Sequence, residues 1–237
     1  QASHRRLPER QPSASDVAGG FPILDERAEL ELDDYVAGIT WAADSSRFAV
    51  AGGEGKVFAG RYAAAAFNAN SVGEHLLGVL TVAWQPGGEA FATVGQDGSV
   101  TLWNGEGAEL KRWRPAATGT EHLAFSPDGK LLATASGRTV KLWSSAGELV
   151  HEFAAAPKPV AALSFDKAGH SLGAATTGEV AVHRLDGGKY QTRRYLWDAP
   201  CLTVSFSPNG KVLAAGVADG SVHFWYLNSA KDSQMRG

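Results

Sequence analysis

The sequence predicts an all-β fold: a β-propeller of four-stranded antiparallel blades, five of which are visible in the chain. The first observation behind this prediction is an aromatic residue ahead of a turn, which returns at intervals of 43, 41, 40 and 41 residues, at Trp41, Trp84, Phe125, Phe165 and Phe206. The second is a tryptophan that ends the third strand of three repeats, at Trp103, Trp143 and Trp225. A fixed period near forty residues is typical of stacked supersecondary units, and four short strands per period are typical of a propeller blade.

The third repeat shows the strands of one blade in order. Residues 122–125 form an apolar strand that ends in Ser126-Pro127-Asp128-Gly129, where proline, aspartate and glycine suit the angles of a tight turn. Residues 130–135 are the second strand and residues 139–143 the third. Residues 148–153 follow a second turn and are the fourth strand.

Repeats two and five keep this order, whereas repeats one and four have drifted from it. Repeat two turns at Asp97-Gly98 and repeat five at Asp219-Gly220, and Asp-Gly between apolar strands is a strong hairpin signal. Repeat one has Lys56-Val57-Phe58 in its third strand and no tryptophan there, and repeat four ends its third strand on His183.

The two ends of the chain bear on whether the ring is complete. Residues 1–20 carry almost no apolar pattern and are predicted to be a disordered leader, and residues 21–237 to be the propeller domain. Residues 27–35 alternate like a strand, which a closed ring would place as the outer strand of the last blade. Residues 231–236, however, stand where the fifth repeat's own outer strand would begin. Because a closed five-bladed ring needs only one of these segments, we expect a propeller that is incomplete at its C-terminus.

Composition argues against two classes of partner. The 237 residues include 22 Lys and Arg against 25 Asp and Glu, whereas nucleic acids and anionic membranes are normally bound by a basic surface. No stretch approaches the ~20 consecutive apolar residues of a membrane helix. The single cysteine, Cys201, excludes an internal disulfide, lies in an apolar run that predicts a buried thiol, and favours a reducing, cytoplasmic compartment.

Three segments resemble the consensus of the WD-repeat (WD40) family of β-propellers: residues 97–103, residues 125–135 and residues 206–211. The resemblance runs from about residue 27 to residue 237, and five copies in register make it specific. Seven-bladed rings are common in that family, so the resemblance implies a part of such a ring. The Trp-Asp pair that names the family is missing, because the three strand-ending tryptophans precede Asn104, Ser144 and Tyr226.

The resemblance also implies a buried polar network with a structural role. Its members are, in repeat two, His75, Thr93 or Ser99, Asp97 and Trp103, and in repeat five, Asp219 and Trp225, with Trp197 at the histidine position. A buried carboxylate or imidazole is tolerable only where each polar atom finds a partner. Because the other repeats contain few of these polar residues, we expect apolar packing to hold most blades together.

No catalytic, cofactor-binding or metal site is predicted. The seven histidines are scattered over different repeats without the spacing of a metal site. A phosphate-binding Gly-x-x-x-x-Gly-Lys loop is absent too. The paired carboxylates Asp33-Asp34 are predicted to form a solvated acidic face. The arginines expected in outer strands are predicted to guard sheet edges, at Arg112, Arg114, Arg193 and Arg194.

The predicted function is that of a non-catalytic scaffold that binds other proteins through propeller faces and rim loops. In the family, contacts often use the face of the inner hairpin turns and of the starts of the innermost strands. The resemblance therefore implies contact residues at Tyr35, Gln96, Arg138, Lys158 and Trp197. Arg, Tyr and Trp dominate interface hot spots, but Tyr35 and Trp197 have the alternative of packing between blades.

The alternative function is a propeller hydrolase or lactonase with a metal in the central channel. Such a site needs Asp, Glu, Asn or His side chains that converge at the starts of the innermost strands. The corresponding segments are mostly apolar or small, as in Val36-Ala37-Gly38 and Pro200-Cys201. The sequence therefore favours the scaffold over the enzyme.

Overall fold

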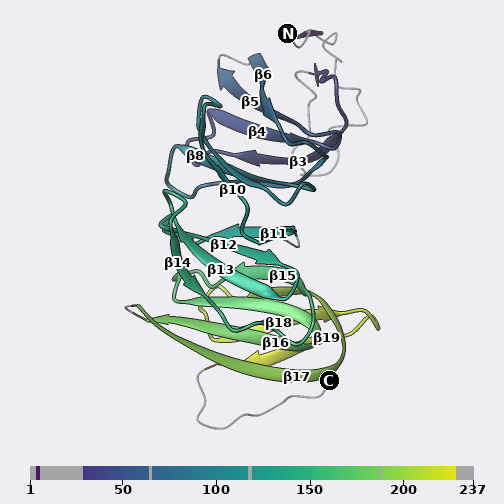
Figure 1. Cartoon of the computed structure of the whole chain (residues 1–237), viewed down its shortest axis with the longest axis vertical. Helices are drawn as coiled ribbons and strands as arrows, with labels where there is room; N and C mark the ends of the chain where they lie inside the picture. Colours follow the sequence, from purple (N-terminus) through teal and green to yellow (C-terminus); the bar gives the residue numbers. More distant parts are fainter. Residues whose placement is uncertain (1–3, 6–28, 64–65, 117–118, 187, 228–237) are drawn as a thin grey trace, which may run out of the picture.

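The structure of the chain is a computed structural model that describes residues 4–5, 29–63, 66–116, 119–186 and 188–227. Every regular element in these ranges is a β-strand, and successive sheets follow one another from one end of an elongated molecule to the other (Figure 1). A small two-stranded sheet pairs β1 (His4–Arg5) with β2 (Glu29–Leu30). The predicted all-β fold of four-stranded antiparallel sheets is confirmed.

Each of the first three blades is one sheet of four antiparallel strands in chain order. The first blade contains β3 (Val36–Trp41), β4 (Arg47–Gly52), β5 (Lys56–Ala63) and β6 (Ala66–Glu74). The second contains β7 (Val79–Trp84), β8 (Ala90–Gly95), β9 (Val100–Asn104) and β10 (Glu109–Trp113). The third contains β11 (His122–Phe125), β12 (Leu131–Ser136), β13 (Thr139–Ser144) and β14 (Leu149–Glu152), each within one residue of its predicted bounds.

The fourth and fifth blades contain two long strands, of which one, β17 (Lys189–Phe206), is shared by both blades. The strands concerned are β15 (Val160–Phe165), β16 (Ser171–Asp186), β17, β18 (Val212–Val217) and β19 (Val222–Tyr226). The Leu185 amide donates to the His170 carbonyl at 2.8 Å, so β16 folds back on itself as the inner hairpin of the fourth blade. The first part of β17 pairs with β16, and residues 201–206 pair with β18 as the innermost strand of the fifth blade.

Neighbouring blades pack a face of large side chains onto a face of small ones. Trp84 and Phe91 of the second blade are buried against Ala49 and Ala51 of the first. The third blade on the second and the fourth on the third repeat this arrangement. Because burying one large apolar side chain stabilises a fold by roughly 1.5–3 kcal/mol, these contacts between blades are the main source of cohesion.

The two ends of the array leave such faces exposed. Ile39 and Trp41 of the first blade, which occupy the positions of Val82 and Trp84 in the second, are 58% and 44% exposed. Phe224, on the outward face of the last blade, is exposed as well. Figure 1 places β3 and β19 toward opposite ends of the molecule. The completeness of the ring stays a prediction.

The predicted strand over residues 27–35 is wrong for residues 31–35, and residues 27–28 lie outside the described residues. Within the described part of this range only Glu29–Leu30 is a strand, and it pairs with β1 and not with the last blade. The chain turns instead at Asp34, whose carboxylate accepts hydrogen bonds from the backbone amides of Glu54 at 2.9 Å and Lys56 at 3.2 Å. Asp33 forms an ion pair with Lys56. The Asp33-Asp34 pair therefore holds the inner turn of the first blade and is not merely a solvated acidic face.

Two further expectations concern the leader and the cysteine. His4–Arg5 form β1, and the rest of the predicted leader lies outside the described residues. The predicted burial of Cys201 is confirmed, because its side chain packs between the fourth and fifth blades and burial raises the pKa of its thiol.

Candidate functional site

The inner hairpin turns and the starts of the innermost strands lie on one face of the array. In the first blade the Gly53 amide donates to the Tyr35 carbonyl at 2.8 Å, and in the second the Gln96 amide donates to the Gly78 carbonyl at 2.8 Å. In the fifth blade the Ala218 amide donates to the Pro200 carbonyl at 2.9 Å. Because each turn is bonded to the start of its own innermost strand, both kinds of segment form a single surface, called the turn face below.

Two of the predicted contact residues, Tyr35 and Gln96, are brought together on the turn face through two glycines. A side chain on Gly53 would collide with the Tyr35 ring. A side chain on Gly78 would collide with both the Gly53 carbonyl and the Gln96 amide nitrogen. The Tyr35 ring covers Gly53 and remains 64% exposed, so most of the ring is available to a partner.

Sequence reasoning missed two exposed leucines beside this pair. Leu76 and Leu77 precede Gly78 in the loop that leads into β7, and they are 80% and 52% exposed. The Leu77 carbonyl lies against Gly55, so this loop lies beside the inner turn of the first blade. The signal that could have found them is an apolar pair directly after His75 in a segment between strands. Tyr35, Leu76 and Leu77 form the apolar patch of the turn face.

The other predicted contact residues lie further along the turn face. The Arg138 guanidinium donates through Nε to the Ala156 carbonyl at 2.6 Å, and the Ala156 amide donates to the Arg138 carbonyl at 2.8 Å. Lys158 is exposed in the same loop. Trp197 is only partly exposed and lies against the His223 ring with 3.7 Å between ring centroids. This contact agrees with the alternative interpretation, in which Trp197 packs between two blades. The five residues thus fall into three separate groups.

Beneath the apolar patch, the second blade contains a buried polar chain. Trp103 Nε1 donates to the Thr93 hydroxyl at 2.8 Å, and that hydroxyl lies 2.8 Å from His75 Nε2. On the other side of the imidazole, Nδ1 lies 2.9 Å from the Ser99 hydroxyl, which donates to the Asp97 carboxylate at 2.7 Å. One assignment satisfies every group: Thr93 donates to Nε2, and Nδ1 donates to Ser99.

The pKa values of His75 and Asp97 agree with that hydrogen-bond assignment. Burial lowers the pKa of His75, which is therefore neutral near pH 7, and its contact with Asp97 at 3.4 Å is not an ion pair. Burial alone would raise the pKa of Asp97, but hydrogen bonds from the Ser99 hydroxyl and amide, with His75, outweigh it and lower that pKa to about 2. An ionised Asp97 caps the inner turn and fixes the turn face above it.

The fifth blade has a more exposed version of this arrangement. The Ser221 hydroxyl donates to the Asp219 carboxylate at 2.6 Å and lies 2.8 Å from Nε2 of His223. Trp197 covers the His223 ring, and Trp225 is buried. His223, which was not among the predicted members, contacts the Ser221 hydroxyl as His75 contacts that of Ser99 in the second blade.

The fourth blade holds a buried ion pair that the sequence did not reveal. Arg194 pairs with Glu179, whose side chain is almost fully buried. Nearby, the buried imidazole of His183 lies 2.8 Å from the Thr192 hydroxyl and stacks on Phe153. Arg194 is thus a core partner and does not guard a sheet edge. Likewise, Arg112 donates to the Glu109 carboxylate and to the Glu74 carbonyl.

One sequence motif of hydrolases occurs in the chain without the structure that it has in those enzymes. Gly169-His170-Ser171-Leu172-Gly173 fits Gly-x-Ser-x-Gly, which in those enzymes is a turn between a strand and a helix. Here it lies in a hairpin between two strands, and the Ser171 amide donates to the Asp166 carboxylate at 3.0 Å. Within the described ranges, no group of three His, Cys, Asp or Glu side chains is placed to hold a metal ion. None of the elements described is a helix that could cross a membrane.

Comparison with known proteins places these observations in a family context. The family model described as "WD domain, G-beta repeat" matches residues 69–104, 117–144 and 195–226. The chain is 28% identical over 65% of its length to mouse (Mus musculus) WD repeat and HMG-box DNA-binding protein 1. It is 40% identical over 34% of its length to Actin-interacting protein 1 of Drosophila melanogaster, and 28% identical over 66% to Small ribosomal subunit protein RACK1 of Medicago sativa. The chain spans 14%, 14% and 41% of these proteins, respectively.

Proposed function

The chain belongs to the WD-repeat family, and from that premise we propose that it is a non-catalytic scaffold that binds partner proteins through its turn face. WD repeats support a role in protein interaction in general. Two of the relatives carry names that state an association, one with actin and one with the small ribosomal subunit. Those names describe the relatives, and the partner of this chain is to be identified by experiment.

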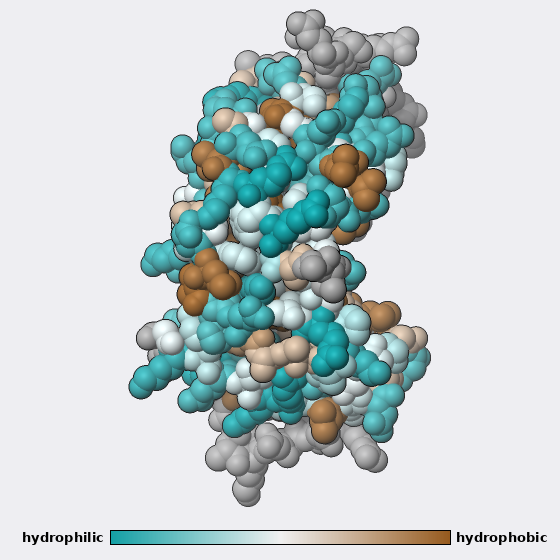
Figure 2. Space-filling model, in the orientation of Figure 1, coloured by the Kyte–Doolittle hydropathy of each residue, from teal (hydrophilic) through white to brown (hydrophobic). Residues whose placement is uncertain are grey.

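The observation that carries the proposal is the apolar patch of Tyr35, Leu76 and Leu77. Hydrophobic side chains form separate small patches on an otherwise hydrophilic surface (Figure 2). Exposed apolar groups that cluster within a polar rim are typical of protein-binding sites. The loops under the patch are closely packed, because a side chain on Gly53 would collide with the Tyr35 ring and one on Gly78 with the Gly53 carbonyl. Preorganised loops reduce the entropy lost on binding.

The same observations favour protein over nucleic acid as the partner. One relative is named as a DNA-binding protein, but that name also states an HMG box, and the chain spans 14% of that protein. The net charge of −3 gives the chain no overall positive charge of the kind that favours binding along a phosphate backbone. The patch itself is apolar, which suits a protein surface better than a phosphate backbone.

Affinity capture with quantitative mass spectrometry tests this proposal. Leu76→Ser/Leu77→Ser removes the apolar patch while it leaves the buried network in place. Leu149→Ser/Val150→Ser is the matched control, because these leucine and valine side chains are also exposed but lie on the outer strand β14. We expect a set of partners that is retained by wild type and control and lost from the Leu76→Ser/Leu77→Ser variant. Identical partner sets for all three proteins would contradict the proposal.

A further inference from the structure

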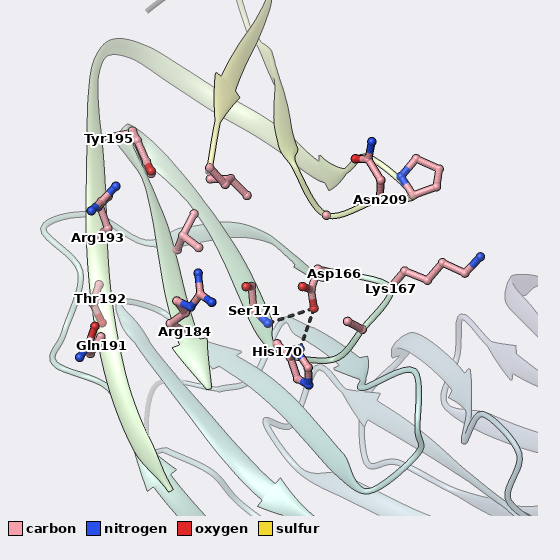
Figure 3. A pocket seen from close by; sticks show the side chains of 15 residues that line it. Asp166, Lys167, His170, Ser171, Arg184, Gln191, Thr192, Arg193, Tyr195 and Asn209 are labelled. Atoms are coloured by element: carbon pink, nitrogen blue, oxygen red, sulfur yellow. Dashed lines mark hydrogen bonds between the residues drawn. The ribbon is translucent and has the colours of Figure 1, made fainter. Parts of the chain in front are cut away.

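A second surface with a distinct chemistry lies at the opposite ends of the strands. A cavity of about 950 Å³ opens between the fourth and fifth blades. Figure 3 shows one wall made of Arg184, Gln191, Arg193 and Tyr195 from β16 and β17, and facing turns that carry Asp166, His170 and Asn209. Because these turns connect first to second strands, the cavity lies away from the turn face.

Among the described residues that line this cavity, cationic side chains outnumber carboxylates. These residues include Arg184, Lys167 and Arg193, the last of which already has an interaction of its own, and one carboxylate, that of Asp166. One oxygen of Asp166 accepts hydrogen bonds from the backbone amides of His170 at 2.8 Å and Ser171 at 3.0 Å, so this carboxylate serves its own turn. The structure records no ion pair between Arg184 and any residue it describes.

Two earlier grooves between blades show how the fold normally balances such cations. Arg61 of the first blade pairs with Glu106 in the outer turn of the second, and Lys111 of the second blade pairs with Glu148 in the outer turn of the third. Arg184 occupies the position of Arg61, one residue beyond the site where three repeats carry tryptophan. In the groove between the fourth and fifth blades, no glutamate is among the described lining residues, and the outer turn of the fifth blade lies outside the described residues.

We propose that this cavity binds an acidic segment of a partner protein, with carboxylate or phosphate groups on Arg184. Guanidinium groups form strong, paired hydrogen bonds with both kinds of anion. Gln191, Thr192 and Asn209 add neutral polar groups around that position. A lining this polar suits an extended peptide better than a small apolar ligand, for which sites are mostly hydrophobic. The inference rests on the proposed function only in that the ligand belongs to a protein.

Fluorescence anisotropy of labelled peptides with the full chain tests this site. The probes are an octaglutamate peptide, a neutral peptide with one phosphoserine, its unphosphorylated form, and octalysine. We expect octaglutamate or the phosphopeptide to bind, more weakly as salt screens the charges, and octalysine not to bind. Which of the two anionic peptides binds more tightly identifies the group that the cavity prefers.

Substitutions at the cavity and on the turn face separate this inference from the proposed function. Arg184→Gln is expected to lower the affinity for the anionic peptide about tenfold. Lys167→Gln, at an exposed turn, should lower this affinity as well. Lys130→Gln, at the corresponding exposed turn of the third blade and outside the cavity lining, is the matched control and should leave the affinity unchanged. Failure of both anionic peptides to bind, or equal affinity for wild type and Arg184→Gln, would overturn the inference. Neither result would affect the partners captured through Leu76 and Leu77.

Discussion

The Nε2 atom of His75 lies 2.8 Å from the hydroxyl oxygen of Thr93 in the interior of the second blade. This contact ties the loop that carries the apolar patch to the second strand of the blade. The same hydroxyl accepts the indole N–H of Trp103, so one threonine satisfies two buried ring nitrogens. The turn face is therefore supported by a fully paired chain of polar groups.

Replacing Thr93 tests this support. Thr93→Val leaves both the indole N–H of Trp103 and the Nε2 atom of His75 without a partner, and we expect a loss of about 2–3 kcal/mol in the free energy of unfolding. Thr101 is the matched control: it is Thr93's cross-strand neighbour, equally buried, and its hydroxyl has no hydrogen-bond partner. Thr101→Val should be neutral or stabilising. Equal losses for the two variants in urea unfolding would refute the role given to Thr93.

Stability is expected to fall in mildly acidic solution because of His183. Burial, with repulsion from Arg194 and His151, lowers its pKa from 6.5 to about 4. Between these two pKa values the unfolded chain binds more protons than the folded one. The contribution of the neutral His183 to the free energy of unfolding is therefore fully present above pH 6.5 and is lost as the pH falls toward 4. The shift corresponds to about 3 kcal/mol. Burial also lowers the pKa values of His75 and His122, which adds in the same direction.

Urea unfolding at a series of pH values measures this dependence. His183→Gln should reduce the slope between pH 6.5 and 4, and His170→Gln, at an exposed position, should leave it unchanged. The carboxylate of Asp97, with its pKa of about 2, titrates below this window and does not confuse the result. A slope that is the same in wild type and His183→Gln would exclude His183 as its source.

The ion pair of the fourth blade predicts a strongly non-additive double substitution. Arg194→Gln leaves the buried Glu179 carboxylate without its counter-charge, and we expect a loss of about 3 kcal/mol in the free energy of unfolding. Glu179→Gln/Arg194→Gln removes both charges and should recover most of that loss. Thermal or urea unfolding of the four proteins gives the coupling between the two residues. Additive effects would show that the pair is not coupled.

The exposed outer face of the first blade predicts self-association. Ile39 and Trp41 occupy positions that pack between blades in the second blade, and an unpaired apolar sheet face favours contact with another copy. We expect the mass measured by light scattering after size-exclusion chromatography to rise with protein concentration. Ile39→Ser/Trp41→Ser should suppress this rise, and Leu149→Ser, at a similarly exposed leucine, should not. A monomer at every concentration would contradict the prediction.

Local patterns predicted the fold better than the site. The strands of the third repeat were predicted within one residue, because alternation and the turn at Pro127 act through local geometry. The strand predicted over residues 27–35 was wrong for residues 31–35 because alternation does not say what a segment pairs with, and Asp34 bonds to a turn twenty residues away. The pairing of Glu179 with Arg194 escaped notice because it lies across a hairpin of a drifted repeat.

The contact residues depend on exposure, which sequence patterns report poorly. Tyr35 and Gln96 lie close together on the turn face because two glycines let their loops approach, an arrangement that spacing does not reveal. Trp197 packs on His223, whereas Leu76 and Leu77, which resemble core residues in the sequence, are exposed. All of these positions stay predictions as contact residues until a partner is in hand.

Hydrogen exchange of the chain, alone and with a captured partner, is the measurement that decides where partners bind. A scaffold that uses its turn face should show slower exchange in the loops around Tyr35, Gly53–Gly55, Leu76–Gly78 and Gln96 when the partner is present. The outer strand β14 should exchange at the same rate in both states. Protection confined to the outer strands, with no change in the loops of the turn face, would contradict this account.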